Sequence, residues 1–519
     1  MIAPRVVTEA RPRGVRQMDL QELIEKLGIE APPGGCGSVR ITDVTDDSRT
    51  VMPGSLFVAR AGTKFDGRVY IEQAVCDGAV AVLTDRVGAE RVNAACAMAL
   101  VADDVPMAAA QLAERFYGNP TRKLRLVGIT GTNGKTTVAH LLHGILNTAG
   151  IRAGLVGTVS IDDGRETADA EMTTPGAVEL SRTFASMVEA GYQAAVMEVS
   201  SHALDQRRAA GLSFDIGVFT MLGTDHMDYH KDRDSYLAAK RRLFRMLPGS
   251  GVVVANTDDP AHKEMLTGCS ARLVKCSMSQ GDAVVRVTDR WIDKTGVEMV
   301  GQFGKIQASL PMTGDHNAMN LLQAVTVAHE LGVDSVVIAG ALAKPSLPRG
   351  RLEPVDIAGD VGVFIDFAHT PDALERTLSE MRRAMEQSER AGKLWVVFGC
   401  GGHKDRTKRP VMGEIAGRLA DRVVLTNDNP RSESEDAIID AIFAGIDEAR
   451  REDVIKEPRR EFAIARVFEQ AQPGDVVVIA GKGHEKTQEG CDAHGNVVVR
   501  PFDDAACVLA CVEKRAEAT

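Results

Sequence analysis

A glycine-rich loop between an apolar run and a helical pattern carries the first residues that could perform chemistry. Residues 128–137 read Gly-Ile-Thr-Gly-Thr-Asn-Gly-Lys-Thr-Thr. Backbone N–H groups at the start of a helix can hold phosphate oxygens. We therefore expect Lys135 to meet the β- and γ-phosphates of a nucleotide and the Thr136 hydroxyl to ligate Mg²⁺. Ile129 stands where the common P-loop has glycine, so a glycine-rich turn with an incidental lysine is the alternative.

Further groups that suit a metal or a transferred phosphate follow later apolar runs. Glu198 ends one such run, and its carboxylate could hold Mg²⁺, which prefers hard oxygen ligands; a cap for the next helix is the alternative. His226 lies in Asp-His-Met-Asp-Tyr-His at 225–230, where a solvated histidine pair is the alternative. Lys240 follows on a predicted helix, and from the pattern alone it is one of several charges on a helix face.

The elements that must position these residues form two series in which apolar runs alternate with helical patterns. The first series has its runs at 124–130, 194–199, 216–220 and 252–256. The second starts after a Pro-Arg-Gly turn and has its runs at 361–367, 394–399, 422–426 and 476–480. This alternation is typical of mostly parallel sheets, and ligands of such sheets bind beyond the carboxyl ends of the strands. The polar motifs lie where that rule predicts a site.

We expect an α/β protein with three domains. Residues 18–122, which open with a helical pattern at 18–28, are predicted to form a small N-terminal α/β domain. Residues 123–352 are predicted to form a central P-loop-like ATPase domain with a mostly parallel sheet, and residues 353–519 a C-terminal Rossmann-like α/β domain. Residues 1–17 carry no amphipathic pattern and are predicted to be a disordered tail.

Composition limits the class of function. The formal net charge of −11 argues against a nucleic-acid-binding protein, because a phosphate backbone requires clustered Lys and Arg. The nine cysteines form no CxxC pair, and their odd number argues against a disulfide framework, which fits a cytoplasmic protein. No apolar run is long enough to span a membrane, so we expect no membrane partner. We also expect a monomer.

The loop Gly-Thr-Asn-Gly-Lys-Thr at 131–136 resembles the ATP loop of the Mur ligase family, and the other motifs follow it in family order. The resemblance implies an ATP-dependent, amide-bond-forming enzyme that uses Mg²⁺. It implies these nucleotide-binding residues: Gly131, Thr132, Asn133, Gly134, Lys135, Thr136, Asn320, Arg351 and Asp366. It implies catalytic roles for Lys135, Glu198, His226 and Lys240, and metal ligation by Thr136, Glu198, His226 and the carbamate of Lys240.

The carbamate on Lys240 is itself an implication of the resemblance, and the chemistry behind it is sensible. A bare ammonium beside Mg²⁺ would be repelled, while burial and a nearby cation would lower the pKa of the amine. Reaction with CO₂ turns the side chain into an oxygen ligand. The segment just before His226 departs from the family pattern, because Met221-Leu-Gly-Thr224 stands where members usually have Asn-Leu-Ser-Arg. Local contacts are therefore expected to differ.

Asp428-Asn-Pro-Arg431 resembles the signature of members that add meso-diaminopimelate. Arg431 could pair with the carboxylate at the far end of that amino acid, whereas the terminal ammonium of lysine would be repelled. The implied acceptor site comprises Lys404, Asp428, Asn429, Arg431, Gly481 and Glu485. Lys404 and His403 replace the family's usual arginine and aspartate, and lysine supplies charge without the bidentate fork of arginine.

The resemblance also implies a site for the other substrate, UDP-N-acetylmuramoyl-L-alanyl-D-glutamate. The positions that match are Ser48, Asp66, Thr173, Thr174, Ser200, Gln206 and Arg208. Of these, the two in the first domain match more loosely, and a solvated turn explains them equally well.

The implied reaction joins meso-diaminopimelate to the UDP-dipeptide through an acyl phosphate, as a step of peptidoglycan synthesis. L-lysine or another amino acid is the alternative acceptor. A folate polyglutamylating enzyme would share the core, but the 428–431 signature speaks against it. A nucleotide switch would need no acceptor pocket, and no Asn-Lys-x-Asp motif is present. A catalytically dead binding module would not be expected to keep Lys135 and Glu198.

Overall fold

The structure, a computed structural model, describes residues 17–62, 66–94, 96–223, 225–291, 293–357, 359–388, 390–492 and 496–518. Residues 1–16 of the predicted tail lie outside this part of the chain. The chain divides into two compact units, one of residues 1–284, 300–304 and 319–346 and one of residues 285–299, 305–318 and 347–519. Among the described residues, no helix has the length and apolar character needed to cross a membrane.

The first unit opens with a shorter helix than the sequence pattern predicts. The helix expected at 18–28 is only α1 (Leu20–Ile24), because Asp19 caps it and lies in strand β1 (Met18–Asp19). Strand β1 pairs with β2 (Arg40–Ile41) in antiparallel register. The apolar side chains Leu20, Leu23 and Ile24 are nevertheless buried, as the helical spacing predicts.

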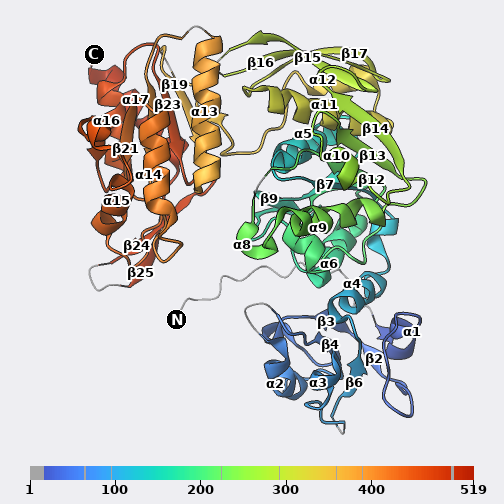
Figure 1. Cartoon of the computed structure of the whole chain (residues 1–519). Coiled ribbons are helices and arrows are strands. Elements are labelled where there is room, and N and C mark those ends of the chain that lie inside the picture. Colours follow the sequence, from blue (N-terminus) through green and yellow to red (C-terminus); the bar gives the residue numbers. More distant parts are fainter. Residues whose placement is uncertain are drawn as a thin grey trace. The chain divides into compact units, whose positions relative to one another are not determined.

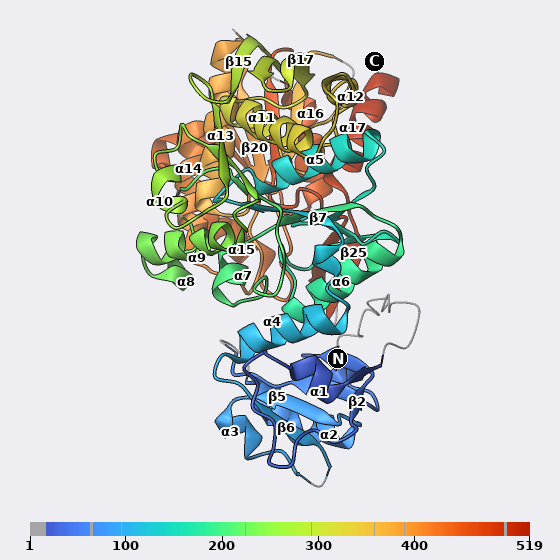
Figure 2. The same ribbon diagram turned by 90° about the vertical axis from the view of Figure 1, so that its right-hand side faces the viewer.

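A four-stranded parallel sheet follows, and helices cover it. Its order is β3 (Asp43–Thr45), β4 (Ser55–Val58), β5 (Ala81–Thr84) and β6 (Met98–Val101). Helix α4 (Val105–Phe116) lies beside this sheet, as both ribbon views show (Figure 1, Figure 2). Its buried residues Val105, Leu112 and Phe116 share one apolar cluster with the sheet residues. This is the small α/β arrangement expected for the start of the chain.

A larger sheet forms the rest of this unit. Its strands that lie wholly in the first unit are ordered β10 (Thr167–Asp169), β9 (Ser160–Asp162), β8 (Ala153–Val156), β11 (Ala194–Glu198), β7 (Arg125–Thr130), β12 (Ile216–Phe219), β13 (Val252–Asn256) and β14 (Arg272–Ser277). From β8 to β14 all neighbours are parallel. The register sets Glu198 beside Ile129 and Phe219 beside Thr130, so the carboxyl ends of three central strands lie level.

Helices on this sheet complete the framework of the phosphate loop. Helix α5 (Lys135–Thr148) starts directly after the loop, and α6 (Ala177–Glu189) and α9 (Arg233–Met246) pack on the strands. Phe184 of α6 and Phe244 of α9 belong to the same buried cluster as Leu126 and Met197 of the strands. The short helix α7 (Ser201–Asp205) follows β11.

The second unit contains a doubly wound sheet, as expected for a Rossmann-like domain. Its order is β18 (Glu353–Pro354), β19 (Gly362–Asp366), β23 (Val476–Ala480), β20 (Leu394–Phe398), β21 (Arg422–Leu425) and β22 (Val454–Lys456). All neighbours are parallel except β18 and β19. A two-stranded antiparallel hairpin, β24 (Thr487–Cys491) and β25 (Val497–Pro501), follows the last long strand.

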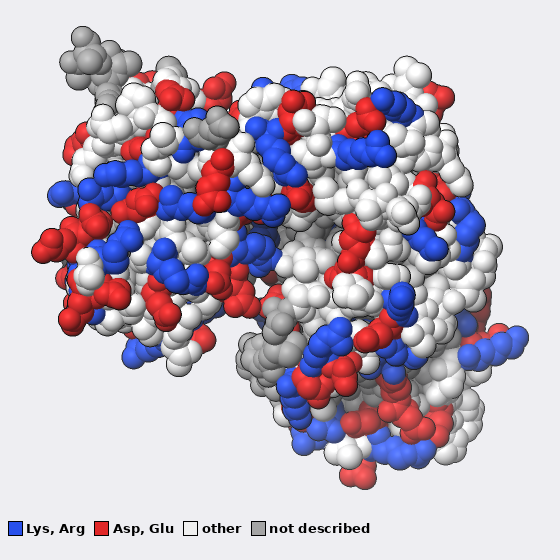
Figure 3. Space-filling view, turned by 45° about the horizontal axis from the view of Figure 1, so that its top comes forward, with Lys and Arg blue, Asp and Glu red and all other residues white. Residues whose placement is uncertain are grey.

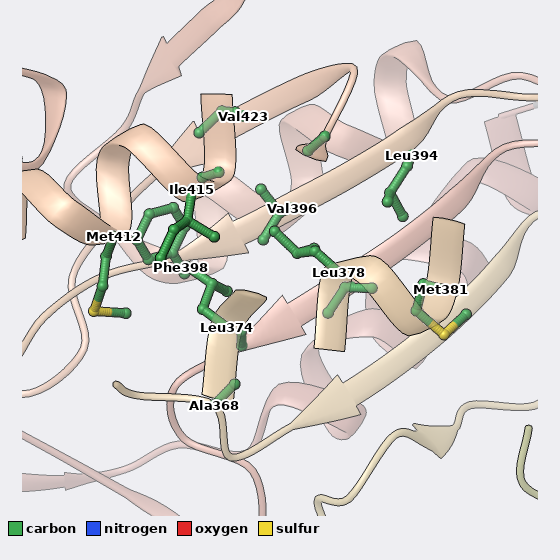
Figure 4. Packing of buried hydrophobic residues seen from close by; sticks show 14 of the residues in the cluster. Ala368, Leu374, Leu378, Met381, Leu394, Val396, Phe398, Met412, Ile415 and Val423 are labelled. Atoms are coloured by element: carbon green, nitrogen blue, oxygen red, sulfur yellow. The ribbon is translucent and has the colours of Figure 1, made fainter. Parts of the chain in front are cut away.

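Alternate residues of these strands face two separate cores. Val396 and Phe398 pack with helices α13 (Pro371–Gln387), α14 (Lys408–Leu419) and α15 (Glu435–Phe443), a cluster seen in Figure 4. On the other face, Trp395 and Val397 pack with α16 (Arg460–Gln470) and α17 (Asp504–Ala518). The period of two along a strand buried on both faces accounts for the continuous apolar runs in the sequence.

On the face drawn in Figure 3, Lys and Arg are interspersed with Asp and Glu.

Candidate active site

The glycine-rich loop connects β7 to α5, and its backbone requires glycine at two positions. Gly134 has φ +84° and a Cβ there would clash with the Asn320 amide, while a Cβ at Gly131 would clash with the Thr220 hydroxyl. Thr220 donates to the carbonyl of Asn133 at 2.5 Å and so fixes the loop. The loop therefore packs closely against Asn320, which the sequence analysis assigned to the same nucleotide site.

Two lysines far apart in the sequence converge on this loop. Lys135 Nζ donates to the carbonyls of Gly131 and Thr132, at 3.0 Å each. Lys240 Nζ, on α9 and buried, donates to the same Gly131 carbonyl at 2.7 Å. Burial lowers the pKa of Lys240 well below its ordinary value, and the nearby charge of Lys135 lowers it further. This lowering favours the unprotonated amine, which is the form that reacts with CO₂.

Tyr236, which the sequence analysis did not select, joins the loop to Lys240. Its hydroxyl lies 3.0 Å from Thr132 Oγ1, and its ring centroid lies 4.5 Å from Lys240 Nζ. Tyr236 and Lys240 are four residues apart on α9, so they share one face of that helix. That spacing is the sequence signal that could have identified this tyrosine.

Glu198 occupies the centre of a connected group of hydroxyls at the end of β11. Its Oε2 accepts hydrogen bonds from Thr136 Oγ1 at 2.8 Å and Thr158 Oγ1 at 3.0 Å, and its Oε1 accepts one from Thr158 N at 2.7 Å. Carboxylate and hydroxyl oxygens are hard ligands, so Thr136 and Glu198 fit Mg²⁺. Among the described residues no group of three His, Cys, Asp or Glu side chains could hold a metal. Thr158 carried no recognisable sequence motif.

His226 contacts a group of rings that includes His202 and Tyr236. Its backbone has φ +56°, and its ring centroid is 4.7 Å from that of His202 and 6.4 Å from that of Tyr236. Its Nε2 lies 3.5 Å from Asp225 Oδ2. These ring contacts place His226 beside His202 and Tyr236.

The residues predicted for the dipeptide form the other side of the Glu198 group. Thr173 accepts from Thr158 Oγ1 at 3.1 Å, and Thr174 Oγ1 donates to the Glu198 carbonyl at 2.8 Å. The N–H of Ser200 donates to Thr174 Oγ1 at 3.1 Å. One carboxylate therefore connects the start of α5 with the predicted acyl-substrate side.

Arg208 and Gln206 continue this group. Arg208 Nη1 donates to the Thr174 carbonyl and Nη2 to Gln206 Oε1, both at 2.8 Å. Burial lowers the pKa of Arg208, and the charge of Arg60 lowers it further. Arg60, which the sequence analysis missed, thus lies near the predicted dipeptide side.

The two residues predicted for the uridine side lie in short turns of the first domain. Ser48 begins a 3-10 turn (Ser48–Thr50), and Asp66 caps another (Gly67–Tyr70). Asp66 pairs with Arg68 Nη2 at 2.8 Å. These contacts are those of solvated turns, and nothing in them selects a uridine.

Asp366 and Arg351 meet at the end of β19 in the second unit. The buried Asp366 carboxylate accepts hydrogen bonds from Leu352 N at 2.8 Å, Ala368 N at 2.9 Å and Thr377 Oγ1 at 3.0 Å. Burial raises the pKa of Asp366, while Arg351 acts in the opposite direction. The buried Nε of Arg351 has no hydrogen-bond partner among the described residues, and the guanidinium carbon lies 5.4 Å from the centroid of the Phe367 ring.

The predicted acceptor residues gather around the loops that follow β21 and β23. Asn429 Nδ2 donates to Glu485 Oε2 at 3.0 Å. The fully buried Lys482 Nζ lies 3.0 Å from Asn429 Oδ1 and 3.3 Å from Glu485 Oε2. A Cβ at Gly481 would lie 2.5 Å from Asp428 Oδ2, so glycine is required there. Lys482 stands inside the predicted motif but had no role assigned to it.

Arg431 approaches the same loops with a left-handed backbone, φ +55°. Its Nη1 donates to the Gly402 carbonyl at 3.0 Å, and its Nε lies 2.7 Å from Glu489 Oε2 of strand β24. A Cβ at Gly401 would lie 3.2 Å from Arg431 Nη1 and 3.5 Å from Lys404 Cγ. The structure therefore brings Lys404 and Arg431 together and adds Glu489, which the sequence analysis missed.

A buried arginine forms hydrogen bonds to the start of both acceptor loops. Arg460 pairs with both carboxylate oxygens of Asp504 at 2.7 Å. It also donates to the carbonyls of Asn427 at 3.3 Å and Ala480 at 3.0 Å, which directly precede Asp428 and Gly481.

Three family models match most of the chain. Residues 40–117 match the Mur ligase family catalytic domain, residues 129–328 the Mur ligase middle domain, and residues 350–483 the Mur ligase glutamate ligase domain. These matches follow one another in the order of the three predicted domains.

Curated relatives cover nearly the whole chain. A Chlorobaculum tepidum protein named UDP-N-acetylmuramoyl-L-alanyl-D-glutamate–2,6-diaminopimelate ligase is 41% identical over 515 residues, covering 96% of this chain and 98% of the relative. A Streptomyces avermitilis protein of the same name is 42% identical over 503 residues, covering 95% and 96%. A solved structure with that name has a TM-score of 0.68 at 30% identity and covers 96% of this chain and 99% of its own.

Proposed function

Because the chain belongs to the Mur ligase family, we propose that it joins meso-2,6-diaminopimelate to UDP-N-acetylmuramoyl-L-alanyl-D-glutamate at the expense of ATP. The product is the UDP-N-acetylmuramoyl tripeptide of peptidoglycan synthesis. Relatives at about 40% identity carry this activity in their names. The observation that carries the proposal is the Glu198 group, which links Thr136 of the phosphate loop to Thr173 and Thr174 of the dipeptide side.

The first step transfers the γ-phosphoryl group of ATP to the free side-chain carboxylate of the D-glutamyl residue. A carboxylate is a poor acyl donor, and phosphorylation supplies a leaving group. Lys135 and the N–H groups at the start of α5 offset the charge that develops on the phosphoryl oxygens. Asn320 lies beside the loop, where it suits contact with the base of the nucleotide. Arg351 supplies a further positive charge for the nucleotide phosphates.

The second step is attack of the acceptor amine on the acyl phosphate. The tetrahedral intermediate collapses to an amide and releases phosphate. The protein contributes mainly by holding the reacting groups together and excluding water. Asp428, Asn429 and Glu485 suit the ammonium groups of the acceptor, and Arg431 and Lys404 suit its carboxylates.

Mg²⁺ would be held by Thr136 and Glu198, together with His226 and a carbamate on Lys240, and would offset phosphate charge. Burial and the nearby charge of Lys135 lower the pKa of the Lys240 amine, which favours carbamate formation because only an unprotonated amine attacks CO₂. Without that modification, the amine donates to Gly131 and holds the loop.

We propose three further properties. The domain boundaries lie near residues 122 and 353; the first falls between two family-model matches, and the second falls just inside the match to residues 350–483. The protein acts as a monomer. It works in the cytoplasm, where its nine free cysteines would stay reduced.

Release of phosphate from ATP should require the UDP-dipeptide and the acceptor together. The acyl phosphate forms only on the dipeptide carboxylate, and turnover needs the acceptor amine to discharge it. The measurement is coupled phosphate release with each substrate omitted in turn. Release that proceeds without the UDP-dipeptide, or that a folate substrate supports equally well, would contradict this function.

A further inference from the structure

Strand β24 forms one wall of the acceptor site, a role that no motif predicted for it. Gln488 Nε2 donates to the Asp428 carbonyl at 2.8 Å, and Glu489 N donates to Asn429 Oδ1 at 2.9 Å. Arg431 N donates to the Glu489 carbonyl at 3.3 Å, and Cys491 Sγ donates to the Arg431 carbonyl at 3.0 Å. These contacts hold Arg431 in its left-handed conformation, which is costly for a residue with a side chain.

The side chain of Glu489 makes the most consequential of these contacts. Its Oε2 lies 2.7 Å from Arg431 Nε, while Arg431 Nη1 donates to the Gly402 carbonyl at 3.0 Å. One edge of the guanidinium is therefore taken by a carboxylate of the protein itself. The side chains remain 27% and 36% exposed, so the pair is accessible to a ligand and screened by water.

We propose that Glu489 limits the preference for acceptors with a far carboxylate, because it competes with that carboxylate for Arg431. This inference rests on the proposed function of Arg431. With no acceptor bound, Glu489 neutralises the guanidinium. An acceptor with a far carboxylate must share or displace that pairing, which weakens its binding. An acceptor that ends in an ammonium meets a neutralised arginine, which reduces the repulsion that would otherwise exclude it.

The sign of the effect follows from this competition. Removal of the Glu489 charge should leave Arg431 fully available to a carboxylate and more repulsive to an ammonium. An exposed pair of this kind is weak, so we expect Glu489→Gln to lower KM for meso-diaminopimelate about three- to tenfold, with kcat within about twofold. KM for L-lysine should rise or stay the same. The variant should therefore discriminate more sharply than the wild type.

The test compares steady-state KM and kcat for both acceptors in the full-length enzyme at saturating ATP and UDP-dipeptide. Glu469→Gln is the matched control, because Glu469 is exposed on α16, nine residues beyond Arg460 and roughly 13 Å along the helix. Unchanged KM for ATP in Glu489→Gln reports an intact fold. Glu489→Asp, which keeps the charge but shortens the side chain, should lie between wild type and Glu489→Gln.

Arg431→Ala provides the second background. If Glu489 acts through Arg431, Glu489→Gln in that background should leave KM for diaminopimelate unchanged. An equal decrease in both backgrounds, or a KM that stays constant or rises in the single variant, would overturn the inference. A wild type that uses neither acceptor defeats the proposed function itself, whereas a wild type that uses diaminopimelate with a KM insensitive to Glu489 defeats only this inference.

Discussion

Lys240→Ala should lose ligase activity by about a hundredfold to a thousandfold while the protein stays folded. The Lys240 amine lies at the Gly131 carbonyl beside Lys135, where it contacts the loop that holds the transferred phosphate. Alanine removes that contact and every ligand that a carbamate would supply. The measurement is kcat for phosphate release, with circular dichroism as the check on folding.

Matched variants separate this role from a general effect of charge. Lys263→Ala removes an exposed lysine from the neighbouring helix α10 (His262–Met265) and should leave kcat unchanged. Lys240→Arg keeps a positive charge but cannot form a carbamate, so it should stay as inactive as Lys240→Ala. Partial recovery of Lys240→Ala by added formate or acetate would support the carbamate. Full activity of Lys240→Ala would remove this lysine from the site, and an active Lys240→Arg would remove the carbamate.

Arg431→Ala should abolish most of the preference for meso-diaminopimelate over L-lysine. A charge-assisted hydrogen bond to a carboxylate contributes about 1.5–3 kcal/mol, which is roughly 10- to 160-fold. Repulsion of the lysine ammonium by Arg431 adds to this, so discrimination of roughly a hundredfold is expected in the wild type. The variant loses the attraction for the far carboxylate and the repulsion of the lysine ammonium together. The measurement is the ratio of kcat/KM for the two acceptors.

Lys404→Ala is the informative companion to that variant. Lys404 lies with Arg431 around Gly401 but supplies a point charge instead of a fork. The Lys404→Ala variant should bind both acceptors more weakly, and it should change the ratio of their kcat/KM values less than Arg431→Ala does. A wild type that uses lysine equally well would contradict the role assigned to Arg431, and would leave the phosphoryl-transfer chemistry in place.

The framework of the site was predictable because each motif stands where a buried strand ends. The run at 252–256 and the run at 476–480 are strands with those limits, and Glu198 ends β11. Parallel register then brings the ends of β7, β11 and β12 to one edge of the sheet. The helix predicted at 18–28 was too long. Apolar spacing carries no information on backbone angles, and Lys26 adopts φ +62°, which is outside the helical region.

The supporting residues were not predictable in the same way. Thr158 acts through Glu198, forty residues away along the chain, and Glu489 acts through Arg431, nearly sixty residues away. A threonine or a glutamate in a polar segment has no local pattern that distinguishes such a partner from water. Tyr236 is the exception, since its spacing from Lys240 places both on one face of α9.

The identity of the acceptor is the central claim, and a competition experiment tests it most directly. The enzyme is supplied with UDP-N-acetylmuramoyl-L-alanyl-D-glutamate, ATP, Mg²⁺ and equal concentrations of meso-diaminopimelate and L-lysine, and the tripeptide products are quantified by mass spectrometry. The diaminopimelate product should exceed the lysine product by about a hundredfold. Equal amounts of the two products, or a predominance of the lysine product, would contradict it.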